Sequence, residues 1–471
     1  METFGVVVIG AGPGGYPAAI RAAQLGATVA VVEKEELGGT CLNWGCIPTK
    51  TLIASSDLYA RLKSAGEMGL KVEGAAFDYA AMAARKDQVV GVLRNGIKQL
   101  LKAHGVKIFK GTAAFQTRNR VVVKSEASPG DTSSSYTAIG AEKTIIATGA
   151  TSSMPGFLPR HKRVLESRSF LELKSLPSSA LVLGGGIVGC EFACLLAQLG
   201  LRVTVVELLE DILWNLDADV RRELRRHMEN TLGIRILTGR TLENITADDH
   251  SVDGTVGEEQ VKADVLLAAL GRKPVTEELK PENAGLATSP QGFIEVDEYG
   301  RTRVATIYAI GDVTGGPQLA HAATSQGLVA AENACSRSLR KNEKYIPNCV
   351  FTSPEIGTVG ISEQEARAQG REIKTGKFML GALGKALAMG GPMGFVKWIA
   401  DAETDQLLGA QVVGPHATEL IAEATMAIRA ELTATELART VHAHPTLAEA
   451  WMESAHVLEG SPIHSLPKKK K

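Results

Sequence analysis

The stretch VVVIGAGPGG, residues 6–15, determines the fold class of the first part of this 471-residue chain. Its first four residues are apolar and β-branched, as expected for a strand that is buried on both faces of a parallel sheet. The glycines Gly10, Gly12 and Gly15 permit a tight turn, close approach of a pyrophosphate, and packing of a helix on the strand. A helix and a second strand are predicted over residues 16–32, so the pattern indicates a dinucleotide-binding βαβ unit.

The same pattern recurs in the middle of the chain. A short apolar strand precedes GGGIVG, residues 184–189, and a helix and a second strand follow it. The spaced glycines of this second motif are Gly184, Gly186 and Gly189. Glu33 ends the second strand of the first unit and Glu207 ends its counterpart, where a carboxylate can accept from ribose hydroxyls. Two such units predict two dinucleotides, and the natural pair for redox chemistry is a flavin and a nicotinamide.

Glu207 also indicates which nicotinamide is bound. A carboxylate at this position binds the ribose 2′-hydroxyl and repels a 2′-phosphate, whereas an arginine would do the reverse. Arg202 lies at the other end of the predicted strand. The sequence therefore predicts NAD rather than NADP.

Two cysteines, Cys41 and Cys46, follow the first unit in GGTCLNWGCIPTK, residues 38–50. On about one and a half turns of helix they can approach within the roughly 7 Å between Cα atoms that a disulfide needs. Two unconnected buried thiols are the alternative, because free cysteine is among the most buried residue types. The spacing is not the familiar two-residue redox spacing, so the pair alone leaves both interpretations open.

The rest of the chain alternates predicted strands and helices. Residues 77–105 have apolar residues at helical spacing, and residues 125–135 are predicted to form a loop. Strands that turn on Gly149 and Gly271 are expected to close the two dinucleotide units. From about residue 345 the chain has no glycine fingerprint and predicts a separate α+β domain. Its predicted strands are 396–399 and 409–413, and its predicted helices are 417–431 and 436–441.

Two further segments carry groups suited to binding or catalysis. A predicted buried strand ends at Gly311-Asp312, where a carboxylate would face ligand at the carboxyl edge of a sheet, although a helix cap is an alternative. In HAHPTLAE, residues 442–449, a turn can bring the Glu449 carboxylate to a histidine and fix its tautomer. A surface histidine pair or metal ligation remains open from the residues alone.

Composition argues against nucleic acid and membrane partners. The formal charge is −1 and aromatic residues make up 5 %, which gives no basic, ring-containing surface. No apolar run approaches the roughly 18 residues that a membrane-spanning helix needs, and we expect no signal peptide. Six cysteines in a chain of this size favour a reducing compartment, so a cytoplasmic location is expected. The Lys468–Lys471 run is expected to be a solvated tail.

Taken together, the motifs make the chain similar to the dihydrolipoyl dehydrogenase branch of the pyridine nucleotide–disulfide oxidoreductase family over essentially its whole length. The residues that carry the resemblance are Gly10 to Gly15, Cys41, Cys46, Lys50, Gly184 to Glu191, Gly311-Asp312, Leu319-Ala320-His321, and His444-Pro445-Thr446 with Glu449. The resemblance implies an α/β fold with two Rossmann-like dinucleotide-binding domains plus a C-terminal α+β dimerisation domain. It implies an FAD-binding domain over 1–150, an NAD-binding domain over 151–271, a central domain completing the FAD site over 272–344, and an interface domain over 345–471.

The resemblance also implies roles for individual residues. Cys41 would be the thiol that meets substrate, and Cys46 the thiol beside the flavin. His444, oriented by Glu449, would be the general base, and it would serve the disulfide of the other subunit of a homodimer. The implied FAD and NAD contacts, with no metal site, are Gly10, Gly12, Gly14, Gly15, Glu33, Gly39, Thr40, Lys50, Thr148, Gly149, Gly184, Gly186, Gly189, Glu191, Glu207, Gly271, Gly311, Asp312, Leu319, Ala320 and His321.

The implied reaction is oxidation of protein-bound dihydrolipoamide through the cysteine pair and FAD, with NAD⁺ as acceptor. The implied partners are the lipoyl domains and E2 core of a 2-oxo acid dehydrogenase complex, or the glycine cleavage H protein. No lipoyl domain is expected within this chain. The alternatives are a reductase or diaphorase for another small disulfide, and a flavoprotein scaffold with little turnover. The sequence departs from the family pattern at Trp44, Ala322, Gln326 and Leu383-Gly384.

Overall fold

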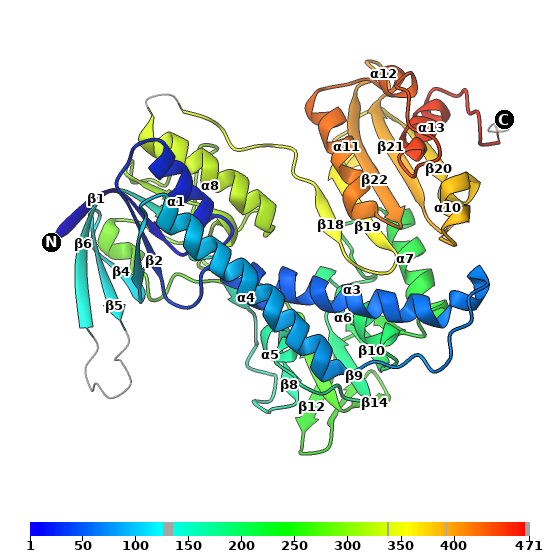
Figure 1. Cartoon of the computed structure of the whole chain (residues 1–471), viewed down its shortest axis with the longest axis horizontal. Helices are drawn as coiled ribbons and strands as arrows, with labels where there is room; N and C mark the ends of the chain where they lie inside the picture. The colour runs from blue at the N-terminus through cyan, green and yellow to red at the C-terminus, as the bar shows by residue number, and fades with distance from the viewer. Residues whose placement is uncertain (126–134, 337–338, 392, 467–471) are drawn as a thin grey trace.

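The computed structural model describes residues 1–125, 135–336, 339–391 and 393–466 (Figure 1). Most of the loop predicted over 125–135 and the Lys468–Lys471 tail lie outside the described residues. In Figure 1 the N-terminal strands form one lobe, the middle of the chain a second, and the C-terminal third a separate lobe above it. The predicted α/β class is confirmed by the mixed α/β elements and the parallel strands of the first two lobes.

The first lobe is built on a seven-stranded sheet in the order β3-β2-β1-β6-β5-β4, with β17 paired to β6. Its parallel strands are β1 (Glu2–Ile9), β2 (Val29–Glu33), β3 (Lys107–Lys110), β17 (Ile307–Ala309) and the end of β6 (Ser135–Ile146). The antiparallel strands β4 (Thr112–Thr117) and β5 (Arg120–Ser125) extend it. Helices α1 (Gly15–Gln24), α4 (Tyr79–Ala103) and α8 (Ala320–Cys335) share a core with the buried faces of β1 and β2.

The second lobe repeats this arrangement in a five-stranded sheet in which every pairing is parallel. Its strands, in spatial order, are β11 (Arg235–Thr238), β10 (Arg202–Glu207), β9 (Ser179–Leu183), β15 (Val265–Ala268) and β8 (Val164–Leu165). Helix α6 (Ile187–Gln198) follows β9, as predicted. An antiparallel sheet of β12 (Glu243–Ala247), β13 (Val252–Val256) and β14 (Glu259–Ala263) packs with it, and β7 (Ala150–Ser152) pairs with β16 (Arg272–Pro274) where the two lobes join.

The C-terminal lobe is an antiparallel sheet in the order β18-β19-β22-β21-β20. The strands are β18 (Asn348–Val350), β19 (Glu355–Gly360), β20 (Ile373–Met379), β21 (Phe395–Asp401) and β22 (Leu407–Gly414). Helix α11 (Ala417–Arg429) packs on β19 and β22, and α13 (Glu449–Leu458) packs on β20 and β21. The helix predicted over 436–441 is instead α12 (Ala434–Ala438), because Thr433 and Glu436 form a capping box that begins it earlier.

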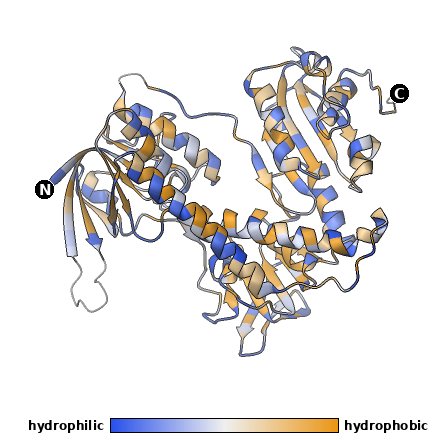
Figure 2. Cartoon of the chain, viewed as in Figure 1, coloured by the Kyte–Doolittle hydropathy of each residue, from blue (hydrophilic) through white to orange (hydrophobic). Residues whose placement is uncertain are grey.

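Two helices connect the lobes. Helix α2 (Gly39–Trp44) and helix α3 (Cys46–Lys63) follow β2, and α3 packs against both α4 and α6. Leu52 and Ile53 of α3 belong to the same core as α6, so the helix that begins at Cys46 is anchored on the second lobe. Figure 2 shows hydrophobic and hydrophilic residues mixed along α3 and α4. Among the described residues, no helix combines the length and apolar character needed to cross a membrane.

Candidate active site

The two glycine motifs have matching backbone geometry. Gly10 has a φ of +99°, and a Cβ there would lie 2.3 Å from the Ala147 carbonyl oxygen. Gly184 has a φ of +110°, and its Cβ would lie 2.5 Å from the Ala269 carbonyl oxygen. Each glycine therefore makes a turn against a strand that leaves no room for a side chain.

The later glycines of the second motif divide into two kinds, and Gly15 of the first motif matches one of them. A Cβ on Gly15 would lie 1.9 Å from the Gly10 carbonyl oxygen, and one on Gly189 would lie 1.9 Å from that of Gly184. These two allow the helix to pack on the turn. By contrast, a Cβ on Gly186 would meet nothing within 4 Å, which is the open surface that a pyrophosphate requires.

The helices that follow the two motifs begin without a side-chain cap. Neither Gly14, before α1, nor Gly186, before α6, has a side-chain cap hydrogen bond, and neither helix has an acid in its first turn. The first N–H groups of these helices lack a side-chain acceptor there, and they favour an anion such as a phosphate. Thr148 supports the same conclusion at the first motif, because its hydroxyl is buried and unpartnered among the described residues. The residues of the two glycine motifs therefore fit the phosphates of two dinucleotides, one at each motif.

The acids that end the second strands are held in the same way in both units. Glu33 accepts from the amides of Ala11 and Glu35, both at 2.8 Å. Glu207 accepts from the amides of Gly185 and Leu209, at 2.5 and 2.8 Å. Burial raises the pKa of Glu33, although the two amides oppose the shift. Each carboxylate is fixed beside its glycine motif, with lone pairs left to accept from a ribose.

The cysteines lie on two successive helices rather than on one. Cys41 is in α2 and Cys46 is the first residue of α3, with Gly45 between the helices. Both are free thiols here, and their side chains are hydrogen-bonded to each other. The hydrogen bond from Cys41 lowers the pKa of Cys46 to about 7, with Lys50 contributing, while the same bond raises the pKa of Cys41. The pair is therefore close, and the two thiols are chemically distinct.

Helices α3 and α6 are joined by a charged pair beside the thiols. Lys50 Nζ lies 2.7 Å from Glu191 Oε2, and Glu191 Oε1 accepts from the Phe351 amide at 2.9 Å. The Lys50 ammonium also lies 4.5 Å from the centroid of the Phe351 ring. Lys50 and Glu191, both among the implied cofactor contacts, thus form an ion pair that joins the two lobes. Phe351 was missed, since nothing in its local sequence marks it.

The Gly311-Asp312 segment lies at the end of β17, as predicted. Asp312 is in a short 3-10 helix, η3 (Gly311–Thr314), and accepts from Arg272 Nε at 3.2 Å. Burial raises the pKa of Asp312, although Arg272 opposes this shift. The Gly311 amide donates to Gln326 at 2.7 Å. Arg272 and Gln326 were missed as parts of this site because only the fold brings them to it.

Several implied contact residues lie around these motifs. A Cβ on Gly39 would lie 2.7 Å from Gly12 Cα, so the start of α2 packs directly on the first glycine motif. Leu319 precedes α8 and Ala320 begins it. His321 Nε2 lies 2.6 Å from the Pro347 carbonyl oxygen. The remaining contacts implied near the motifs are Thr40 in α2 and the positive-φ residues Gly149 and Gly271.

The predicted histidine–acid pair is present in the C-terminal lobe. His444 Nδ1 lies 2.8 Å from Glu449 Oε1, and the Thr446 amide donates to Glu449 Oε2 at 2.8 Å. Burial acts to raise the pKa of Glu449, but the Thr446 amide and His444 outweigh it, and the pKa is lowered. The His444 side chain is 78 % exposed, so its Nε2 edge is open. His442 is paired separately, with Glu423 at 2.6 Å.

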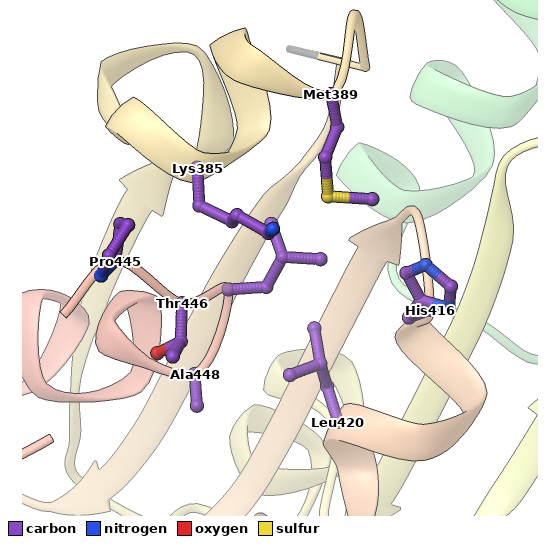
Figure 3. A pocket seen from close by; sticks show the side chains of 8 residues that line it. Lys385, Met389, His416, Leu420, Pro445, Thr446 and Ala448 are labelled. Carbon is purple, nitrogen blue, oxygen red and sulfur yellow. The ribbon is translucent and has the colours of Figure 1, made fainter. Parts of the chain in front are cut away.

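The structure of the single chain does not bring this histidine to the cysteines. Figure 1 shows α13, whose first residue is Glu449, in the upper part of the C-terminal lobe, away from α3. A hollow of about 520 Å³ lies beside the histidine loop. Figure 3 shows Lys385 and Met389 pointing into it from one side and Leu420 from the other, with Pro445 and Thr446 on the rim. The loop that carries His444 is thus at the surface of its own chain.

Comparison with known proteins identifies the family to which the chain belongs. The pyridine nucleotide-disulphide oxidoreductase model matches residues 4–327, and the dimerisation domain of the same family matches residues 346–455. The dihydrolipoyl dehydrogenase of Chlamydia pneumoniae is 42 % identical over 468 residues, covering 99 % of both chains. That of Geobacillus stearothermophilus is 41 % identical, covering 98 % of this chain and 97 % of the relative.

Solved structures of flavoprotein disulfide reductases resemble this chain over nearly its whole length. LpdA of Mycobacterium tuberculosis has a TM-score of 0.88 at 28 % identity, covering 97 % of this chain and 99 % of that one. The HOCl-induced flavoprotein disulfide reductase of Escherichia coli, as its Cu(II) complex, has a TM-score of 0.87 at 29 % identity, covering 97 % and 100 %. The expected fold, the redox chemistry and the pairing of FAD with NAD are confirmed. The chain belongs to the pyridine nucleotide–disulphide oxidoreductase family, and its C-terminal lobe is that family's dimerisation domain.

Proposed function

We propose that this chain is a dihydrolipoyl dehydrogenase, which oxidises protein-bound dihydrolipoamide through Cys41 and Cys46. The proposal is carried by two hydrogen-bonded thiols of unequal pKa, placed between two dinucleotide motifs. Full-length relatives bearing that name support the choice of substrate. FAD and NAD, when bound, accept the electron pair that the substrate gives to the cysteines.

Thiol–disulfide exchange assigns distinct tasks to the two cysteines. A substrate thiolate attacks Cys41 Sγ in the Cys41–Cys46 disulfide, and the S–S bond breaks with Cys46 leaving as thiolate. The Lys50 ammonium, which acts to lower the pKa of Cys46, favours Cys46 as the leaving group. The second substrate thiolate then attacks the mixed disulfide and releases Cys41. The substrate leaves as a disulfide, and the enzyme holds a dithiol with the same electron pair.

His444 accepts one proton during this exchange. Its Nδ1 is engaged by Glu449, which leaves Nε2 as the atom that accepts a proton from the substrate thiol. Glu449 is itself fixed by the Thr446 amide, so the ring orientation is set before substrate binds. The imidazolium that forms is stabilised by the adjacent carboxylate.

Lys50 and Glu191 support the Cys46 thiolate. The Lys50 ammonium lowers the pKa of Cys46, and Glu191 restrains that ammonium between α3 and α6. We assign Asp312, held by Arg272 in η3, and the acids Glu33 and Glu207 to cofactor binding. Glu207 is the acid that favours NAD over NADP.

The dimerisation domain supports a homodimer in which His444 of one subunit acts on the thiols of the other. This arrangement accounts for the exposure of the His444 edge and its separation from α3 in the single chain. Lipoyl domains with the E2 core of a 2-oxo acid dehydrogenase complex, or a glycine cleavage H protein, are the proposed partners. A cytoplasmic location stays a prediction.

Two assays of the purified flavoprotein test the proposal: dihydrolipoamide-dependent reduction of NAD⁺ or NADP⁺, and the reverse reaction, NADH-dependent reduction of lipoamide or glutathione disulfide. We expect His444→Gln to lose at least about a hundredfold in turnover, the usual scale of a general base. His464→Gln is the matched control, because His464 also pairs with a glutamate, Glu453, at 2.7 Å on α13. Turnover with glutathione disulfide but not with lipoamide would overturn the proposed substrate.

A further inference from the structure

Trp44 lies between the two cysteines in sequence and is held by a residue from the second lobe. It is the last residue of α2, and the Arg168 guanidinium carbon lies 3.9 Å from the centroid of its ring. This distance is well inside the roughly 6 Å limit for a cation–π contact. Arg168 is in α5 (Ser167–Leu171), more than 120 residues further along the chain.

Two glutamates hold the Arg168 guanidinium over the Trp44 ring. Its Nη1 donates to both oxygens of Glu35, at 3.3 and 3.1 Å, and its Nε lies 3.7 Å from Glu172. The Glu35 amide in turn donates to Glu33, the acid beside the first glycine motif. The guanidinium is therefore fixed by Glu35, two residues after the end of β2, while its face covers the indole.

Helix α5 has only five residues, but its N-terminal cap and its packing on the core hold it in place. Glu166 caps it by accepting from the amides of Arg168 and Ser169, and its carboxylate also accepts from Ser152. Phe170 packs edge-to-face on Phe192 of α6, with ring centroids 5.4 Å apart. Arg168 thus links Trp44 to the core of the second lobe.

Helix α2 needs such a support. It has six residues, and a helix this short does not hold its shape alone. Its C-terminal end meets α3 at Gly45, where a Cβ would lie 3.0 Å from the Thr40 carbonyl oxygen. The distance between Cys41 and Cys46 depends on how the two helices meet at this glycine, and a disulfide tolerates only a narrow range of that distance.

We propose that Arg168, through its stack on Trp44, is a positioning residue that holds α2 against α3 so that Cys41 and Cys46 close readily into a disulfide. Loss of the stack lets α2 move about Gly45 and lowers the effective concentration of one thiol at the other. The disulfide form is then disfavoured relative to the dithiol. This inference rests on the redox pair of the proposed function but not on its lipoyl substrate.

The test is the equilibrium between disulfide and dithiol in the FAD-loaded protein, set with mixtures of reduced and oxidised dithiothreitol. The Cys41–Cys46 state is read by rapid alkylation and mass spectrometry, so no lipoamide or NAD turnover is needed. We expect Arg168→Met and Trp44→Val each to shift the equilibrium about tenfold toward the dithiol, equivalent to ~30 mV. Trp44→Phe keeps an aromatic face and should stay within about twofold of the parent.

Arg301→Met is the matched control, because Arg301 also stacks on a ring, Tyr299 at 4.9 Å, and pairs with an acid, Asp297 at 2.8 Å. The disulfide–dithiol equilibrium of Arg301→Met should equal that of the parent protein. The double variant of Trp44→Val with Arg168→Met should shift no further than the larger single variant, because both remove one contact. Glu35→Gln, a milder change, should shift it less in the same direction.

Unchanged equilibria in both single variants would overturn the inference, as would an equal shift in Arg301→Met or single effects that add in the double variant. A purely structural role would lower thermal stability without moving the equilibrium. Failure of lipoamide turnover in the parent would overturn the proposed substrate and leave this test intact.

Discussion

Gly45 divides what would otherwise be one helix from Gly39 to Lys63. The cysteine spacing allowed proximity on about one and a half turns of a continuous helix. The break gives a different reason for their proximity: one helix ends at Trp44, and the next begins at Cys46. A hydrogen bond then polarises the pair, and this makes Cys46 the thiol that ionises near neutral pH.

At the residue scale, Cys41→Ala should raise the pKa of Cys46 from about 7 toward its usual range, because it removes the hydrogen bond that stabilises the thiolate. At pH 7 the thiolate fraction of Cys46 then falls. The measurement is the pH dependence of Cys46 alkylation in the reduced protein, followed by mass spectrometry. Cys41→Ser, which still donates a hydrogen bond, is the control. An unchanged alkylation profile in Cys41→Ala would contradict the assignment.

At the element scale, the glycine motifs separate packing from ligand access. Gly189 lies against a backbone carbonyl oxygen, whereas Gly186 faces open space. Glycine therefore has two different roles at positions three residues apart. Alanine substitutions can separate the two roles, because one should lower thermal stability and the other should weaken NADH binding.

Gly189→Ala should lower the thermal unfolding temperature, since its Cβ would collide with the Gly184 carbonyl oxygen. Gly186→Ala should leave that temperature unchanged but weaken NADH binding about tenfold, or ~1.4 kcal/mol, by obstructing the pyrophosphate. Thermal unfolding and NADH titration of both variants check this. Equal destabilisation by the two changes would show that the distinction is wrong.

A second element-scale feature joins helix α7 (Ala218–Asn230) of the second lobe to β21 of the C-terminal lobe. Lys397 is 2 % exposed, and its Nζ lies 3.1 Å from Asp217, 2.9 Å from Asp219 and 2.8 Å from Glu363. One buried ammonium thus neutralises carboxylates from two lobes. Within the described part of the chain, removing it leaves the buried Asp217 carboxylate without a cation, whereas Asp219 keeps Lys377 and Glu363 keeps Arg367.

Lys397→Met should therefore destabilise the protein by about 3–5 kcal/mol, the usual scale for breaking a buried ion pair. Lys262→Met removes an exposed pair with Asp253 and should change stability by less than about 1 kcal/mol. Chemical denaturation followed by intrinsic fluorescence compares the two variants. Similar midpoints for both would mean that the buried cluster contributes little.

At the scale of the whole molecule, the proposed site needs two chains, and this has a sharp consequence. In a mixed dimer of a Cys46→Ser chain with a His444→Gln chain, one site combines both defects and the other has neither. Such a dimer should keep about half of the parent's dihydrolipoamide turnover if His444 acts across the subunit boundary. Co-expression with two different affinity tags isolates it. A mixed dimer as inactive as either homodimer would place His444 on its own chain's thiols.

Most of the fold could be predicted, because local patterns determine it. The strands around the two glycine motifs and the long α4 helix follow from apolar periodicity and turn glycines. The residues that could not be predicted are joined to their sites only by the fold. Arg272 reaches Asp312 and Arg168 reaches Trp44 across lobes, and an arginine in a polar stretch looks like any solvent-exposed residue. The bounds of α12 were wrong because a capping box overrode the apolar pattern.

The acids Glu33 and Glu207 have a further consequence, which concerns the entropy of binding. Each is immobilised by two backbone amides of its own lobe, without help from a ligand. A glutamate side chain usually loses rotamer freedom when it hydrogen-bonds to a ribose, at a cost of up to ~2 kcal/mol. Here that freedom is already removed by folding. If Glu33 and Glu207 bind ribose as proposed, both sites are preorganised, and more of the ribose contact energy goes into affinity.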